Sequence, residues 1–216
     1  MKLKKLLLHP AAKPIVFAVS LLPFTWLFYA AATNQLGANP AEALLRSLGD
    51  WTLRFLCIVL AVTPLRVWTG TPALARFRRM LGLFVFFYAV MHMLSYAWFD
   101  MGLEWGEIVR DIPKRPFILV GFMALLLLTV LAATSFNRAI RWMGGARWRA
   151  LHRAVYAVAA LAVLHFFWMR AGKNNFAEVY VYAGILALLL GWRVVHAWRQ
   201  KRHLAKMTST AATALR

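Results

Sequence analysis

Cysteine and acidic residues are both scarce in this sequence, and the scarcity of cysteine excludes several kinds of site. Cys57 is the only cysteine among 216 residues, so the chain encodes no internal disulfide, no Cys-x-x-Cys-His attachment site and no iron–sulfur cluster. It lies in an apolar run, where we expect it to pack as a small hydrophobic residue. Aspartate and glutamate together number seven, against 26 lysines and arginines.

Long polar stretches are also lacking, since 62% of the residues are hydrophobic and the mean hydropathy is +0.61. The chain is too apolar for a soluble domain of this size, and it shows no internal repeat beyond a weak recurrence of apolar runs. The sequence therefore predicts an all-α integral membrane protein, a bundle of six transmembrane helices. The expected spans are residues 13–32, 51–65, 81–99, 117–134, 151–168 and 179–198.

The two ends of the chain differ in composition from the spans between them. Basic residues followed by an apolar run at the N-terminus are typical of a signal peptide, but His9-Pro10 and Lys13-Pro14 interrupt the run, which is also longer than a signal sequence requires. We therefore expect the first helix to be retained. Residues 207–216 are small and polar, and we expect them to be disordered, which leaves residues 1–206 as one membrane domain.

The net charge of +19 is a topology signal, because the basic residues separate apolar spans and form no basic domain that would bind nucleic acid. Most of them lie in the N-terminal segment, the second and fourth loops and the C-terminal segment. Both termini are therefore expected in the cytoplasm, with lipid around the spans. The opposite loops hold all seven acidic residues, which form either a docking face for a soluble partner or ordinary solvated loops.

Two histidines lie at matching depth in different spans. His92 follows Arg79 by 13 residues and His165 follows Arg149 by 16, so both lie roughly 20 to 24 Å from the cytoplasmic side at 1.5 Å per residue. An ionisable residue inside a span indicates a functional site, here opposing axial ligands of one haem. Two imidazole ligands leave no open iron position and favour electron transfer. The alternative is a pair of histidines hydrogen-bonded between helices.

The role of a third histidine, His152, stays open. Residues 148–168 are predicted to form one apolar helix with His152 near its cytoplasmic end, where the third span offers Arg78, Arg79 and Met80 but no histidine. His152 could hold a second haem together with another ligand such as His196, contact a flavin or quinone head group, or bond to a loop at the interface. The remaining histidines are expected at the interface or in solvated tails: His196, His9 and His203.

A carrier that binds a metal ion or relays protons is a rival function of a different class. Ion-coupled carriers commonly have acidic residues within their spans and a pair of broken half-helices. The expected spans contain no acidic residue, and no such pair is evident. The electron-transfer interpretation is therefore favoured.

Five segments together resemble one family: residues 39–54, 63–66, 78–96, 131–135 and 148–156. They resemble the MsrQ (YedZ) family, the haem-binding membrane subunits of the bacterial periplasmic methionine-sulfoxide reductase system. That family lies in the ferric-reductase-like transmembrane group, which also contains the NADPH oxidases. The resemblance covers nearly the whole chain, and the order of the motifs makes it specific.

The resemblance implies a six-helix b-type cytochrome in the bacterial inner membrane. Such a subunit takes electrons from a quinol or a cytoplasmic flavin reductase and passes them to MsrP, a periplasmic molybdenum-cofactor enzyme that reduces oxidised methionines. The family is described as using FMN as well. His92, His152 and His165 match its haem histidines, which implies one or two haems. The chain would be an oxidoreductase component with no methionine-sulfoxide site of its own.

The chain departs from the wider oxidase pattern in one position and lacks two motifs. The third span has one histidine where that pattern has two. No Gly-x-Gly-x-x-Gly motif follows the membrane part, so the chain cannot oxidise NADPH by itself. No FMN motif is evident, although arginines in the cytoplasmic loops could pair with its phosphate. A stand-alone ferric or quinone reductase of the same fold is the nearest alternative function.

Overall fold

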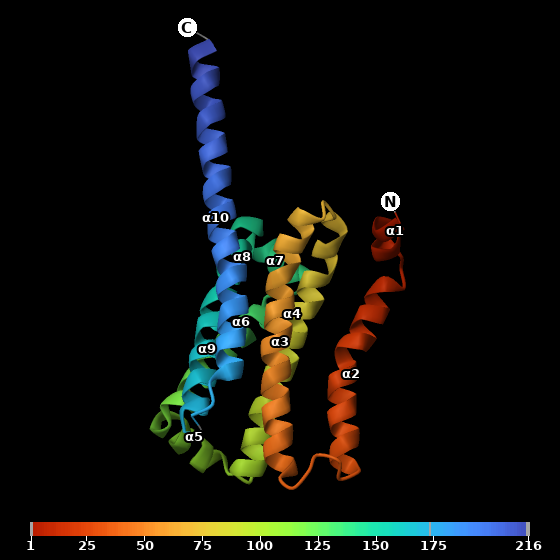
Figure 1. The fold of residues 1–216 in the computed structure, drawn as a ribbon, viewed down its shortest axis with the longest axis vertical. Helices are drawn as coiled ribbons and strands as arrows, with labels where there is room; N and C mark the ends of the chain where they lie inside the picture. The colour runs from red at the N-terminus through yellow and green to blue at the C-terminus, as the bar shows by residue number, and fades with distance from the viewer. Residues whose placement is uncertain (1, 173, 215–216) are drawn as a thin grey trace.

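The computed structural model describes residues 2–172 and 174–214, and within them every regular element is helical. Six helices are long and apolar enough to cross a membrane: Ala12–Ala32, Pro40–Trp68, Pro72–Asp100, Pro116–Ala133, Gly145–Ala171 and Ala177–Arg202. Figure 1 shows them side by side as a bundle. The prediction of a six-helix membrane protein is confirmed, and each expected span overlaps one observed helix.

Two of the spans combine more than one element: Pro72–Asp100 holds three and Gly145–Ala171 holds two. The elements in chain order are α1 (Lys2–Leu8), α2 (Ala12–Ala32), α3 (Pro40–Trp68), η1 (Pro72–Phe77), α4 (Arg78–Ser95), η2 (Tyr96–Asp100), α5 (Trp105–Lys114), α6 (Pro116–Ala133), α7 (Asn137–Met143), α8 (Gly145–His152), α9 (Val155–Ala171) and α10 (Ala177–Ala214). Helix α5 and the α2–α3 connection lie at one end of the bundle, called the α5 end below, and α1 lies at the other (Figure 1).

Helix α3 begins eleven residues before the expected second span, which starts at residue 51. The Asn39 side chain accepts a hydrogen bond from the Glu42 amide at 3.2 Å, and Pro40 occupies the first helical position, so the helix is capped there. Because α3 starts so early, Glu42 and Asp50 lie inside a spanning helix. The expected second span is therefore too short at its start, and the helix that contains it carries two acidic residues before residue 51.

The helix expected over residues 148–168 is two helices. Helix α8 ends at His152 and α9 begins at Val155. The amides of Arg153 and Ala154 bond to carbonyls three residues earlier, at 3.2 and 2.9 Å, so the chain tightens and turns there. His152 and His165 consequently do not share one continuous helix.

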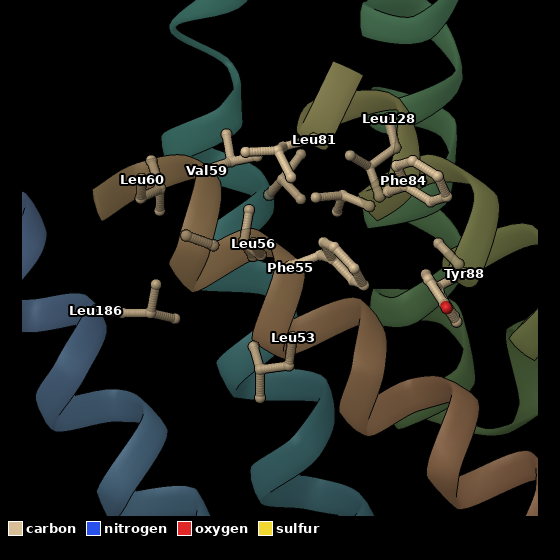
Figure 2. Close-up of a cluster of buried hydrophobic side chains, with 14 of the residues drawn as sticks. Leu53, Phe55, Leu56, Val59, Leu60, Leu81, Phe84, Tyr88, Leu128 and Leu186 are labelled. Carbon is tan, nitrogen blue, oxygen red and sulfur yellow. The ribbon is translucent and has the colours of Figure 1, made fainter. Parts of the chain in front are cut away.

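Four helices form the centre of the bundle. Helix α3 packs along α4 and α6 packs along α9, while α10 lies against α3 and α9. Figure 2 shows the core between α3 and α4, where Phe55 stacks on Tyr88 with ring centroids 5.1 Å apart. Cys57 is half-buried and packs against this core, as expected of a small hydrophobic residue. These helices enclose the candidate site.

Tyr88 also joins α4 to the outer helix α2. Its hydroxyl accepts from the Phe24 amide at 3.1 Å and donates to the Ser20 carbonyl at 2.8 Å. In a regular helix those two backbone groups would bond to each other, so the hydroxyl is inserted into the hydrogen-bond ladder of α2, next to Pro23. The side chain of Tyr88 is fully buried.

Helix α10 continues well beyond the bundle, to Ala214 (Figure 1). It therefore covers most of residues 207–216, where the sequence predicts disorder. Alanine and methionine in that stretch are good helix formers, and this favours continuation of the helix. Residues 215 and 216 lie outside the described part of the chain.

Candidate functional site

His92 of α4 and His165 of α9 lie close together in the interior of the bundle. Their ring centroids are 6.1 Å apart, and the ring planes are inclined at 79°. Both rings line a cavity of about 540 Å³ between α3, α4, α6 and α9, a size typical of cofactor pockets. The structure thus brings together the two histidines that the sequence places at matching depth.

Each ring is held by a backbone carbonyl of the neighbouring helix. Nδ1 of His92 lies 2.9 Å from the Leu45 carbonyl of α3, and Nδ1 of His165 lies 2.6 Å from the Phe117 carbonyl of α6. A carbonyl oxygen only accepts hydrogen bonds, so Nδ1 carries the proton in both rings. The lone pair of Nε2 is then available to a metal in both rings.

A glycine follows each of these carbonyls by four residues and lies against the same ring. A Cβ atom at Gly49 would lie 3.2 Å from Nδ1 of His92, and a Cβ at Gly121 would lie 2.8 Å from Nδ1 of His165. The absence of a side chain lets each helix come close enough for its carbonyl to reach the imidazole. Neither glycine is among the site residues predicted from the sequence, although a glycine isolated in an apolar helix is a signal of close packing.

The same unit therefore occurs twice: a helix that supplies a carbonyl and a glycine, paired with a helix that supplies a histidine. The two hydrogen bonds join residues 47 and 48 positions apart. The sequence shows no such repeat, because the unit consists of one histidine, one glycine and a backbone atom. Its two copies face each other across the cavity.

The cavity is apolar at one end and polar at the other. Towards the middle of the bundle it is lined by Leu56, Val85, Leu128 and Val158. At the α5 end its lining includes ionisable and hydrogen-bonding side chains: Glu42, Arg46, Asp50, Tyr96, Asp100, Arg115 and Arg170. A flat, amphipathic molecule with its polar edge towards the α5 end would match this division.

The pair of histidines fits a haem. Metal–imidazole bonds are about 2.0 Å long and the ring centre lies roughly 1.1 Å beyond the nitrogen, so two ligands on one metal have centroids about 6 Å apart. The observed separation of 6.1 Å agrees. Within residues 2–172 and 174–214, no three His, Cys, Asp or Glu side chains are grouped to hold a metal by themselves. A porphyrin needs only two protein ligands, because it supplies the other four.

His152 lies apart from this pair, at the end of α8. Its Nε2 is 3.1 Å from the Thr134 hydroxyl, and its ring stacks on Trp148 at 4.0 Å. His196 instead stacks on Trp192 and lies 3.1 Å from the Gln200 side chain. In the contacts of the described residues these two histidines do not meet, and neither lines the cavity.

Comparison with known proteins identifies a family for the chain. Residues 48–163 match the family described as "Ferric reductase like transmembrane component". A relative from Polaromonas naphthalenivorans, named "Protein-methionine-sulfoxide reductase heme-binding subunit MsrQ", is 71% identical over 92% of this chain and 91% of its own length. Relatives of the same name from Bordetella pertussis and Rhodospirillum rubrum are 52% and 49% identical, over 88% and 87% of this chain and 91% and 89% of their own.

No solved structure matches the chain. The family match nevertheless covers more than half of the chain, and the relatives match nearly all of it. The chain therefore belongs to the MsrQ family, the heme-binding subunits of protein-methionine-sulfoxide reductase, among the ferric-reductase-like transmembrane components.

Proposed function

We propose that this protein carries electrons across the bacterial inner membrane, through haem b bound by His92 and His165, to the periplasmic molybdenum-dependent reductase MsrP. The observation that carries the proposal is the histidine pair itself. Two imidazoles from separate helices face one cavity 6.1 Å apart, each with Nδ1 tied to a carbonyl. The relatives' name supplies the heme and the methionine-sulfoxide reductase system.

The residues of this chain would bind and shield the cofactor. A haem iron with two imidazole ligands gains and loses single electrons without recruiting an outside ligand. The Leu45 and Phe117 carbonyls keep both imidazoles in the orientation and tautomer that ligation needs. The apolar lining at the middle of the bundle excludes water. Methionine chemistry belongs to MsrP in this proposal.

The charges indicate the orientation of the bundle, and the orientation sets the direction of electron transfer. With most basic residues in the cytoplasm, both termini are cytoplasmic and the α5 end is periplasmic. Electrons from a quinol or a cytoplasmic flavin reductase then enter at the side of His152 and leave at the α5 end, where acidic residues offer a face to MsrP. His152, stacked on Trp148, is the proposed contact of a second cofactor, either a second haem or FMN.

Absorption spectroscopy tests the haem site. The purified protein should show low-spin b-type bands when reduced by dithionite, and His92→Ala and His165→Ala should each abolish them. His196→Ala is the matched control, because that ring also stacks on a tryptophan but does not line the cavity. His152→Ala reports whether a second haem exists, by pyridine-haemochrome quantitation. Absence of haem bands after expression with ample haem would overturn the proposal in favour of a carrier.

A further inference from the structure

Arginines from three helices gather at the end of the bundle opposite the α5 end. Arg66 lies near the end of α3, Arg78 begins α4 and Arg193 lies in α10. The connection between α3 and α4 folds back, with the Thr71 amide donating to the Arg66 carbonyl at 3.2 Å, and this places Arg78 beside α3. The charges of Arg66 and Arg193 both act on Arg78, so the three guanidinium groups form one group, called the arginine cluster below.

Arg193 is held in this position by neutral groups. Pro64 lies inside α3 and has no N–H, so the carbonyl of Leu60, four residues earlier, lacks its helical partner. An Nη atom of Arg193 donates to that carbonyl, and the guanidinium lies over the Tyr156 ring at 5.6 Å from its centroid. These contacts orient Arg193 but do not neutralise its charge.

No carboxylate in the described part of the chain neutralises the arginine cluster. The acidic residues lie in the first half of α3, in or beside η2 and α5, and at the start of α10. The side chains of Arg66 and Arg78 are exposed, and within residues 2–172 and 174–214 they form no hydrogen bond or ion pair. Like charges repel one another at close range, so the arrangement favours an anion between them.

Other arginines near the same connection are already bound by the protein. Arg76 donates to a backbone carbonyl of α1 at 2.7 Å, and Arg79 donates to the Asn137 side chain at 2.6 Å. All of them serve equally as topology signals, but only Arg66 and Arg78 keep their guanidinium N–H groups free of acceptors among the described residues. A free guanidinium edge binds phosphate through two parallel hydrogen bonds.

The surface next to the arginine cluster has the character of a lipid-facing wall. Trp68 follows Arg66 by two residues and meets Trp192 of α10 edge-to-face, with ring centroids 5.6 Å apart. Trp68 is 66% exposed, and Leu188, which lies one helical turn before Trp192, is 76% exposed. Tryptophan is enriched at the level of the lipid headgroups. A ligand with both an anionic headgroup and acyl chains would match this surface.

We propose that the arginine cluster binds the phosphate of an anionic phospholipid from the cytoplasmic leaflet. Arg66 and Arg78 contact the phosphate, Arg193 adds positive charge from within the bundle, and the acyl chains lie against Trp68 and Leu188. Basic pockets between transmembrane helices on the cytoplasmic side are a recurrent binding site for such headgroups. The site depends on the proposed orientation of the bundle and is independent of haem.

Native mass spectrometry of the full chain, freed of lipid in detergent, measures the binding of single phospholipids. Dioleoyl phosphatidylglycerol is anionic, whereas dioleoyl phosphatidylethanolamine has the same acyl chains and no net charge. The wild type should bind the anionic lipid at least about tenfold more tightly, since each arginine near an anionic headgroup contributes about a factor of five. Inorganic phosphate and FMN, which lack acyl chains, should not displace it.

Arg66→Gln and Arg78→Gln should each reduce this preference about fivefold. Arg79→Gln is the matched control, because it removes one charge from the adjacent position but its guanidinium is already bound by Asn137, and it should keep the wild-type preference. If Arg78→Gln fails to fold, Arg66→Gln carries the test, since that side chain is exposed at the end of α3.

Three outcomes would overturn the lipid site. They are equal binding of the two lipids by the wild type, an unchanged preference in a folded Arg66→Gln or Arg78→Gln protein, and an equal loss of preference in Arg79→Gln. Displacement of the lipid by FMN or phosphate would also overturn it, in favour of a soluble phosphorylated ligand. The haem bands test the proposed function separately, so failure of either proposal leaves the other standing.

Discussion

The close contact between each histidine ring and the neighbouring helix requires a glycine as well as the histidine. The ring, the carbonyl and the glycine form one contact, since Gly49 follows Leu45 and Gly121 follows Phe117 by a single helical turn. A methyl group at either glycine would occupy space that the imidazole fills. The two positions differ in how tight that space is.

Gly121→Ala should disturb the proposed haem site more than Gly49→Ala. The added Cβ would lie 2.8 Å from His165 but 3.2 Å from His92, so the first substitution must displace its ring and the second needs only a small adjustment. We expect the former to lose most bound haem or to become partly high-spin, as measured by absorption and electron paramagnetic resonance spectra.

Gly82→Ala is the control for both, because it lies in α4 and a Cβ there meets nothing within 4 Å. It should keep the low-spin spectrum and gain roughly 0.5–1 kcal/mol of helix stability. A Gly121→Ala protein with a normal haem content and spectrum would contradict the close contact.

At the scale of the element, the hydroxyl of Tyr88 acts as part of helix α2. Tyr88→Phe removes the group that joins the Phe24 amide to the Ser20 carbonyl, and we expect a loss of about 1–3 kcal/mol in the stability of the α2–α4 contact. Hydrogen exchange at the Phe24 amide should become faster. Haem content should not change, since Tyr88 does not line the cavity.

Tyr182→Phe is the comparison for that prediction, because its hydroxyl accepts from the more exposed Arg54 side chain in α3. It should leave exchange in α2 unaltered. Equal exchange rates in wild type and Tyr88→Phe would show that α2 closes its ladder without the tyrosine.

The cap of α3 bears on the site through the Leu45 carbonyl, which lies in the second turn of that helix. Asn39→Ala should cost about 0.5–2 kcal/mol and fray the first turn, and this loosens the bond to His92. We expect faster loss of haem to a haem-scavenging protein such as apomyoglobin. Asn39→Ser restores a capping oxygen and should restore haem retention. If the alanine variant loses haem at the wild-type rate, the cap does not contribute to the site.

The sequence predicts the elements better than their junctions. Hydropathy finds the six spans because each is long and apolar, and depth along the spans pairs His92 with His165. The early start of α3 could have been predicted from Asn39-Pro40 followed by Glu42, which is a helix-capping pattern. The break after His152 and the carbonyl partners depend on how neighbouring helices align, which periodicity within one segment does not specify.

At the scale of the whole molecule, the proposed function and a stand-alone reductase predict opposite responses of the reduced haem to MsrP. Haem reduced by dithionite should stay reduced with methionine sulfoxide alone and should be reoxidised when MsrP is added as well. Rapid reoxidation by ferric citrate or a quinone, with no response to MsrP, would identify a stand-alone reductase. Stopped-flow absorption at the haem bands distinguishes the two.

The orientation of the bundle is tested separately. Reporter proteins fused after Ala214 and within the connection between α5 and α6 should report the cytoplasm and the periplasm respectively, because the basic residues gather on the side of the termini. A periplasmic C-terminus would reverse the proposed direction of electron flow.

The repeated carbonyl–glycine–histidine unit also has a consequence for biogenesis. Each unit is complete within one helix pair, α3 with α4 and α6 with α9, so each ligand is oriented as soon as its own hairpin has entered the membrane. The porphyrin, by contrast, needs both hairpins. Haem insertion would therefore join two hairpins that enter the membrane independently. Chains without haem would keep the hairpins apart and stay accessible to proteases that degrade misassembled membrane proteins.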